Sequence, residues 1–263
     1  GFISLGCSKN LVDTEMMIGL MEKAGYEMTE DLNEANVIII NTCTFIDAAK
    51  DESVQTLLQA TEYKKNGKCE KLVAAGCLSQ QFQEGLAREI PELDVLLGTE
   101  SWSKILDAVN ESYRTGKQVN CFDSAPCEHE ELIPRQLVTP KYTAYVKIAE
   151  GCNNGCTFCY IPYVRGKARS RPIPSVVHEV KRLAAQGVKE FNLIAQDLSY
   201  YGRDLGDGTN LAGLLRELVK VEGVKWIRLF YLYPTYFTDE LLDLITREKK
   251  ICKYVDIPLQ HIS

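Results

Sequence analysis

Apolar runs alternate with amphipathic stretches along the first half of the chain. The strand-like runs are residues 2–5, 37–42 and 71–76. Val37 to Ile40 is continuously apolar, as expected of a strand that is buried on both faces. The stretches between the runs are long enough for crossover helices, one capped by Asn10 and one over residues 47–63. The pattern therefore predicts an α/β fold with a parallel, Rossmann-like sheet.

The second half of the chain also alternates between strand and helix patterns. Its strand-like runs are residues 144–149, 191–195, 226–230 and 254–257. Helical patterns lie between them, one with Ser175 as N-cap and Gly187 as terminator, and another after Thr238. These β/α repeats are typical of a barrel whose reactive groups lie at the carboxyl ends of the strands. Four strands cannot close a barrel, so we expect a partial, truncated one with an open edge.

Proline and acidic residues separate the two halves. Residues 121–141 contain three prolines and the acidic run at 128–131, a composition typical of a linker. We therefore predict one domain over residues 1–120 and a second over residues 142–263, incomplete at its C-terminus. His129, within the acidic run, is interpreted as a solvated side chain rather than a ligand.

Length and charge limit the classes of function. The chain has 263 residues with 45% hydrophobic composition, enough for two modest cores. Its formal charge of −6 and pI near 5.3 argue against a broad nucleic-acid surface. A protein or small-molecule substrate is easier to accommodate.

Cysteine content points to a compartment. Ten cysteines would suggest disulfides in a small secreted domain. Here no charged-then-apolar leader and no membrane-length apolar run is recognised, so we expect a reducing cytoplasm and metal ligation. The sequence opens without Met inside an apparent strand and stops just past another, so we expect a fragment.

The densest cysteine cluster is Cys152, Cys156 and Cys159, directly after the strand-like run 144–149. A four-iron cluster normally takes one cysteine per iron, so three ligands leave one iron free for chemistry. A zinc site would want a fourth ligand nearby, and none follows Cys159. The alternative of three small buried hydrophobes would need this spacing to arise by chance in a polar loop.

A second trio is dispersed along the first half. Cys7, Cys43 and Cys77 each follow the end of a predicted strand. Ligands of open α/β sheets bind outside the carboxyl ends of the strands, so the three cysteines should converge on one crevice. Spacing alone leaves open whether they hold a cluster or are ordinary buried cysteines. The remaining cysteines, interpreted as structural or free thiols, are Cys69, Cys121, Cys127 and Cys252.

The spacing of Cys152, Cys156 and Cys159 resembles the signature of the radical S-adenosylmethionine enzymes. That resemblance implies that the free iron binds the amino and carboxylate groups of S-adenosylmethionine. It further implies that an electron from the cluster cleaves the sulfonium to a 5′-deoxyadenosyl radical, which abstracts hydrogen from an unactivated carbon.

Taken together, the motifs resemble those of the radical S-adenosylmethionine methylthiotransferases over nearly the whole chain. They comprise residues 5–15, Cys43, Cys77, residues 152–159, Ile161-Pro162 and Arg165-Gly166. The phrases Gly-Cys-Ser-Lys-Asn-Leu-Val-Asp (residues 6–13) and Asp-Ile-Pro-Leu-Gln-His (residues 256–261) resemble the branch that modifies an aspartate of ribosomal protein uS12. The family implies two [4Fe-4S] clusters, one on each trio, and a C-terminal TRAM domain that we expect to be missing here.

Further site residues are assigned from position and resemblance. Gln196 and Asp197 are expected to bind the aminocarboxylate or ribose of S-adenosylmethionine, although Asp197 could equally cap the next loop. Phe158 is expected near the adenine or packed beneath the cluster. Arg165 opens a basic stretch and is expected to bind a carboxylate of cofactor or substrate, with a solvated turn as the alternative. Strand-end candidates without an assigned role are Tyr231 to Tyr233, Gln260 and His261.

The resemblance implies the reaction of a sulfur-group transferase. One S-adenosylmethionine donates a methyl group to sulfur at the cluster of Cys7, Cys43 and Cys77. A second supplies the radical that takes hydrogen from the aspartate β-carbon, which then acquires the methylthio group. Expected partners are uS12 and an external electron donor, with no membrane, and with nucleic-acid contact only through the missing domain. The alternatives are methylthiolation of transfer RNA adenosine and a non-catalytic electron-transfer or scaffold protein.

Overall fold

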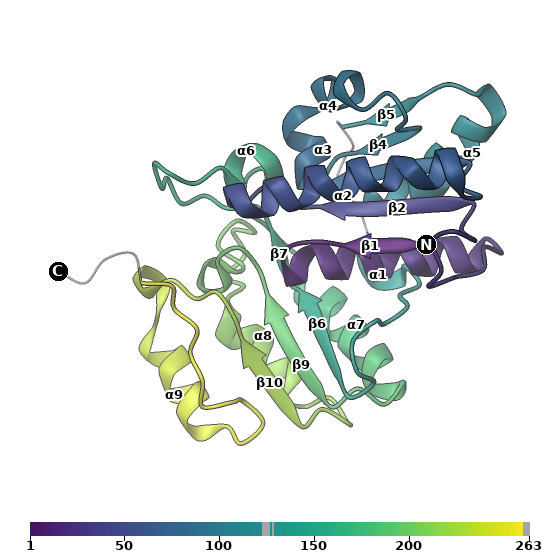
Figure 1. Ribbon diagram of the computed structural model, residues 1–263. Coiled ribbons are helices and arrows are strands. Elements are labelled where there is room, and N and C mark those ends of the chain that lie inside the picture. The colour runs from purple at the N-terminus through teal and green to yellow at the C-terminus, as the bar shows by residue number, and fades with distance from the viewer. Residues whose placement is uncertain (123–126, 128, 260–263) are drawn as a thin grey trace. The chain divides into compact units, whose positions relative to one another are not determined.

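The computed structural model describes residues 1–122, 127 and 129–259 (Figure 1). Gln260 and His261 lie outside the described residues. The chain forms two compact units, which are described separately. Unit 1 contains residues 1–128, 133–136 and 163–165, and unit 2 contains residues 129–132, 137–162 and 166–263. The domain boundaries expected from the sequence remain a prediction.

Unit 1 is built on a parallel sheet, which confirms the predicted Rossmann-like fold. Its strands, in spatial and chain order alike, are β1 (Phe2–Ser4), β2 (Val37–Thr42), β3 (Lys71–Gly76), β4 (Val95–Leu97) and β5 (Val119–Cys121). Every residue of β2 is buried, as its apolar run predicts. The register pairs Ser4 with Asn41 and Thr42 with Gly76, so β1, β2 and β3 end at one edge of the sheet.

Helices cover the sheet of unit 1 (Figure 1). They are α1 (Ser8–Lys23), α2 (Asp47–Asn66), α3 (Cys77–Phe82), α4 (Glu84–Glu89) and α5 (Ile105–Thr115), with a short 3-10 turn at Trp102–Lys104. Leu57 of α2 joins Ile38, Ile40, Leu72 and Ala74 in one core, while α1 packs against α5. These crossover helices are long enough to make the parallel pairing possible.

The expected N-cap of the first helix is wrong. The helix begins at Ser8 with Cys7 as its N-cap, and Asn10 lies inside it. The Asn10 amide instead donates to the carbonyl oxygens of Leu5 at 3.0 Å and Thr42 at 2.8 Å. Asn10 therefore joins the ends of β1 and β2.

Unit 2 contains a parallel sheet in the order β10–β9–β6, formed by β6 (Thr143–Lys147), β9 (Glu190–Ile194) and β10 (Trp226–Leu229). An antiparallel pair, β7 (Ala149–Glu150) and β8 (Arg169–Ser170), follows the first strand. Its helices are α7 (Ile173–Ala185), α8 (Leu211–Leu218) and α9 (Asp239–Arg247); the 3-10 turns are η2 (Glu130–Leu132), η3 (Leu198–Tyr200) and η4 (Pro234–Tyr236). The short helix α6 (Ile161–Arg165) begins in unit 2, and its residues 163–165 belong to unit 1. One core joins α7 and α8 to the sheet, as the β/α repeats predict.

Two details of unit 2 differ from expectation. Residues 254–257 form no strand; Ile251 instead makes a single parallel bridge to Ile227, and Asp256 bonds the backbone after β10. Pro172 is the N-cap of α7, so Ser175 lies in its first turn. The cap at Thr238 is confirmed, because its hydroxyl accepts from the Leu241 N–H at 3.2 Å.

Charged residues of the expected linker are docked rather than solvated. In unit 1, Arg135 forms an ion pair with Glu15 of α1 at 2.5 Å, with both side chains fully buried. In unit 2, Glu131 accepts a hydrogen bond from Ser175 at 2.6 Å, and Glu130 lies 3.7 Å from Lys147. His129 is 72% exposed, as expected. Lys147 thus offsets the negative charge of Glu130.

No helix within the described ranges is both long and apolar enough to cross a bilayer.

We expect Leu72→Ala to destabilise the protein by about 2–5 kcal/mol, because it opens a cavity in the core that Leu72 shares with Ile38 and Leu57. Leu58 of α2 is 45% exposed, so Leu58→Ala is the matched control and should change stability by less than about 0.5 kcal/mol. Guanidinium unfolding of both variants measures the difference. Equal costs would contradict the sheet core described here.

Candidate metal centres

The first cysteine trio lies at the carboxyl edge of β1, β2 and β3. Cys7 is the N-cap of α1, Cys43 directly follows β2, and Cys77 opens α3 after β3. Burial raises the pKa of the Cys77 thiol to about 11, and negative charge on Cys7 and Cys43 adds to the rise. The structure therefore brings these three sulfur atoms close enough to interact electrostatically, as the strand-end pattern predicts.

Glycines leave room around the first trio. Gly6 has a φ of +85°, and a Cβ there would lie 2.5 Å from Cys43 Cβ and 2.7 Å from its Sγ. Gly76, with a φ of +88°, would place a Cβ 2.8 Å from the Thr42 carbonyl oxygen. Both positions require glycine for backbone conformation and for space.

Two buried hydroxyls lie close to this trio in the sequence. Ser8 follows Cys7 directly and Ser79 lies two residues after Cys77. Within the part of the chain that the structure describes, neither hydroxyl oxygen has a hydrogen-bond partner. A buried polar atom of this kind suits a site that holds a further group.

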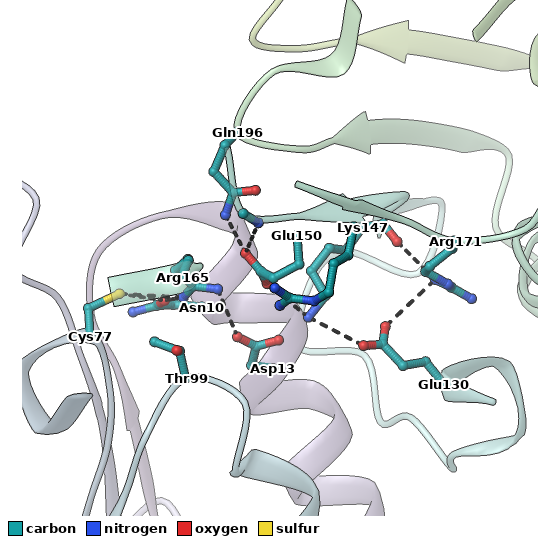
Figure 2. Close-up of polar contacts among 12 residues, drawn as sticks. Asn10, Asp13, Cys77, Thr99, Glu130, Lys147, Glu150, Arg165, Arg171 and Gln196 are labelled. Atoms are coloured by element: carbon teal, nitrogen blue, oxygen red, sulfur yellow. Dashed lines mark hydrogen bonds and ion pairs between the residues drawn. The ribbon is translucent and has the colours of Figure 1, made fainter. Parts of the chain in front are cut away.

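Arg165 lies within unit 1, beside the first trio (Figure 2). Its guanidinium contacts Asn10 Oδ1, Asp13 Oδ2 at 3.5 Å and Cys77 Sγ at 3.5 Å. The positive charge opposes the rise in the pKa of Cys77 that burial causes. The solvated-turn alternative is wrong for Arg165, since its side chain is 1% exposed. Binding of a cofactor carboxylate by Arg165 stays a prediction.

The second trio lies in the loop after β7, within unit 2. The Cys159 N–H donates to the Cys156 carbonyl oxygen at 3.1 Å, and the Asn154 N–H to Cys152 Sγ at 3.4 Å. Burial raises the pKa of the Cys152 thiol, and charges on Asp197, Cys159 and Cys156 raise it further. The loop thus holds its three thiols in electrostatic reach of one another.

Asp197 secures that loop. One carboxylate oxygen accepts from the Ser199 N–H at 3.1 Å and the Ser199 hydroxyl at 2.6 Å, which caps η3. The other accepts from the Asn154 side chain at 2.9 Å. The capping alternative from the sequence is therefore observed, while binding of S-adenosylmethionine by Asp197 stays a prediction.

Gln196 takes part in a buried polar chain (Figure 2). Its amide nitrogen donates to Glu150, and Glu150 lies 3.3 Å from the Lys147 ammonium. Gln196 Oε1 is buried and has no hydrogen-bond partner among the residues described. This oxygen is an available acceptor for a cationic ligand group.

A hollow adjoins the second trio in unit 2. Its lining consists of Ala149, Gly151, Cys152, Asn153, Asn154, Ala168, Ser170, Asp197, Tyr200 and Tyr201. Phe158 is 75% exposed, so packing beneath the loop is not seen, and a place near the adenine stays a prediction. Arg171 in the basic stretch is also not solvated, because it forms an ion pair with the buried Glu179 at 2.5 Å.

Cys69 and Tyr231 lie in different settings from the two trios. Cys69 is buried and its Sγ lies 3.4 Å from the Lys71 carbonyl oxygen. Tyr231 has a φ of +61°, and its N–H donates to Asp256 at 3.0 Å. Among the described residues, no three His, Cys, Asp or Glu side chains are arranged for a single metal ion. Cysteines of a four-iron cluster each bind a different iron, which needs a wider spacing.

Comparison with known families separates the chain into the same two halves. Residues 1–98 match the family described as Uncharacterized protein family UPF0004, and residues 146–263 match the Radical SAM superfamily. The chain combines a UPF0004 domain with a radical SAM domain. The resemblance inferred from the cysteine motifs is thereby confirmed.

Several curated relatives are similar to this chain over nearly its whole length. The ribosomal protein uS12 methylthiotransferase RimO of Syntrophotalea carbinolica is 52% identical over 99% of this chain and 57% of its own length. The RimO proteins of Pelobacter propionicus and Symbiobacterium thermophilum are 49% and 51% identical, over 58% and 54% of their lengths. The chain thus spans just over half the length of these relatives.

Solved structures agree on the fold. The radical S-adenosylmethionine methyltransferase TsrM from Kitasatospora setae has a TM-score of 0.61 and 16% identity, covering 89% of this chain and 54% of its own. The cobalamin-dependent S-adenosylmethionine radical enzyme OxsB has a TM-score of 0.56 and 10% identity, over 93% and 41%. These likenesses confirm the predicted combination of a parallel-sheet domain and a partial radical SAM domain.

Sequence reasoning missed the polar residues that support the two trios. Asn10, Asp13 and Thr99 surround residues 164–165 in unit 1, and Lys147 and Glu150 support Gln196 in unit 2. Charged residues next to an apolar strand run, as at Lys147 and Glu150, are the signal that could have found the second group.

We expect Asp197→Ala to speed amide hydrogen exchange in residues 152–159 by about 2- to 30-fold, the factor for the ~0.5–2 kcal/mol of a lost cap. The variant removes the bonds to Ser199 and Asn154. Asp207→Ala is the control, because Asp207 is exposed and bonds only locally to Thr209 among the contacts described. Equal protection of residues 152–159 in both variants would show that Asp197 does not hold the loop.

Proposed function

We propose that this chain carries two [4Fe-4S] clusters and belongs to an S-adenosylmethionine-dependent enzyme that methylthiolates an aspartate β-carbon of ribosomal protein uS12. The observation that carries the proposal is the pair of cysteine trios. The first trio follows the carboxyl ends of parallel strands, the second follows β7, and each supplies three sulfur ligands rather than four. Similarity to the RimO proteins over 99% of the chain supports the same reaction and substrate.

The residues around the first trio suit a four-iron cluster. Cys7, Cys43 and Cys77 provide the thiolate ligands such a cluster requires. Gly6 leaves space against Cys43, and the Ser8 and Ser79 hydroxyls are free to bond a further group. The N-terminus of the 16-residue helix α1 faces Cys7 and favours negative charge there.

The second trio suits the radical cluster. Cys152, Cys156 and Cys159 would be its ligands, and Asp197 holds their loop through Asn154. Gln196 Oε1 would accept from the ammonium of S-adenosylmethionine, with Glu150 fixing the orientation of the Gln196 amide. Phe158, exposed in the same loop, would cover the adenine. When bound, the two clusters supply one-electron reduction of S-adenosylmethionine and an iron that can hold sulfur.

A protein substrate is favoured over transfer RNA. Two of the cations in the basic stretch, Arg165 and Arg171, are buried in ion pairs with Asp13 and Glu179 and so present no charge to phosphate. The net charge of −6 also disfavours nucleic acid. The protein partners would be uS12 and an external electron donor. Six thiolate ligands need reducing conditions, which favours a cytoplasmic location. The domains would run over residues 1–120 and 142–263.

The activity test incubates anaerobically reconstituted protein with S-adenosylmethionine and a reductant, and offers uS12 or transfer RNA in parallel. The proposal expects 5′-deoxyadenosine together with a methylthio group on a uS12 aspartate, detected by mass spectrometry. Methylthiolated adenosine in the RNA would favour the other branch. Absence of 5′-deoxyadenosine would favour an electron-transfer or scaffold role.

Iron counting tests the two trios separately. Cys7→Ala and Cys156→Ala should each lose about half of the iron and sulfide, because each removes one ligand of one cluster. Cys69→Ala is the matched control, since Cys69 is a buried cysteine of unit 1 outside both trios, and should keep the full content. Full iron in either trio variant would contradict the assignment.

A further inference from the structure

The turn of α6 that follows the second trio contributes a buried cation to the first. Arg165 lies six residues after Cys159 in the sequence, yet Tyr163–Arg165 belong to unit 1. The Arg165 side chain is 1% exposed there. A guanidinium is seldom buried this deeply unless it has a specific partner.

Three of the partners of the guanidinium differ in chemistry (Figure 2). Nη2 donates to Asn10 Oδ1 and lies 3.5 Å from Cys77 Sγ. Nη1 lies 3.5 Å from Asp13 Oδ2, whose side chain is 5% exposed. The planar guanidinium therefore contacts an amide oxygen, a carboxylate and a thiol sulfur at the same time.

The surrounding bonds fix this guanidinium in place. The Val164 carbonyl accepts from the Thr99 hydroxyl at 2.7 Å, which anchors the backbone next to Arg165. The Asn10 amide is bound to the Leu5 and Thr42 carbonyls, so its oxygen presents a fixed acceptor. Arg165 therefore cannot turn away from Cys77 without losing its hydrogen bond to this fixed oxygen.

We propose that Arg165 is a positioning residue that donates to the sulfur of Cys77 and thereby raises the reduction potential of the cluster on the first trio. The proposal rests on the assignment of that cluster to Cys7, Cys43 and Cys77. A hydrogen bond to a ligand sulfur stabilises the more negative, reduced state more than the oxidised one. Asp13 has the opposite effect, because its negative charge offsets part of the guanidinium charge.

The test isolates the first cluster. Changing Cys152, Cys156 and Cys159 to Ala together leaves only the first trio to bind iron. Arg165→Met, Arg165→Lys and Asp13→Asn are then made in this background, with Lys167→Gln as the control. Lys167 is an exposed cation two residues along the chain, so its loss changes net charge without touching Cys77. The midpoint potential is measured by redox titration monitored by electron paramagnetic resonance.

The four variants have distinct expected outcomes. Arg165→Met should shift the redox equilibrium about tenfold toward the oxidised cluster, about 59 mV for one electron. Arg165→Lys keeps the charge but loses the planar guanidinium, so its shift should be smaller and of the same sign. Asp13→Asn should shift the potential upward, and Lys167→Gln should leave it unchanged. Two changes of opposite sign distinguish tuning of the sulfur from simple loosening of the site.

The proposal is overturned if the Arg165 variants have the potential of the background, or if Asp13→Asn moves it in the same direction as Arg165→Met. If Arg165→Met does not retain iron, Arg165→Lys and Asp13→Asn still show whether the midpoint potential shifts in opposite directions. If the triple Cys→Ala protein binds no iron at all, both the assignment of the cluster to the first trio and this inference are wrong. If the first cluster is present but its midpoint potential is the same in the Arg165 variants, only this inference is wrong.

Discussion

Parallel pairing of β1, β2 and β3 is the constraint on which the first sulfur site depends. Strands that run in the same direction and stay in register must end at the same edge of a sheet. Ser4 pairs with Asn41 and Thr42 with Gly76, so the next residues along each strand emerge together. Cysteines from segments more than thirty residues apart in the sequence thus meet without any local motif.

Polar residues at this edge hold the ends of β1 and β2 together. Asn10 binds the ends of two strands, and Asn41 donates in turn to the Asn10 carbonyl at 2.8 Å. Arg165 enters this network with its charge directed at Cys77 and Asp13. In unit 2 the equivalent support is local: Asp197 caps η3 and holds the cysteine loop through Asn154. One trio therefore depends on the register of a sheet and the other on a short loop.

Much of this arrangement could be predicted from sequence, because apolar runs and strand-end cysteines are local patterns. Strands β1, β2 and β3 of unit 1 and the β/α alternation of unit 2 followed from them, whereas β4 and β5 were not predicted. The start of α1 could not be predicted, because capping rules favour side chains with an oxygen and Cys7 has none. Residues 254–257 include three apolar side chains, but they form no strand, and Ile251 makes a single bridge to Ile227 instead, so the apolar pattern misplaced the pairing. The docking of Glu130 and the burial of Arg165 depend on partners far away in sequence, which no local pattern contains.

The central claim is that each trio of cysteines holds its own iron-sulfur cluster. An anaerobic crystal structure of the reconstituted protein, with anomalous scattering recorded at the iron edge, tests it most directly. The account predicts two groups of iron peaks, one bound by Cys7, Cys43 and Cys77 and one by Cys152, Cys156 and Cys159, each with one iron that no cysteine binds. A single group, or iron bound by Cys69, Cys121, Cys127 or Cys252, would contradict it.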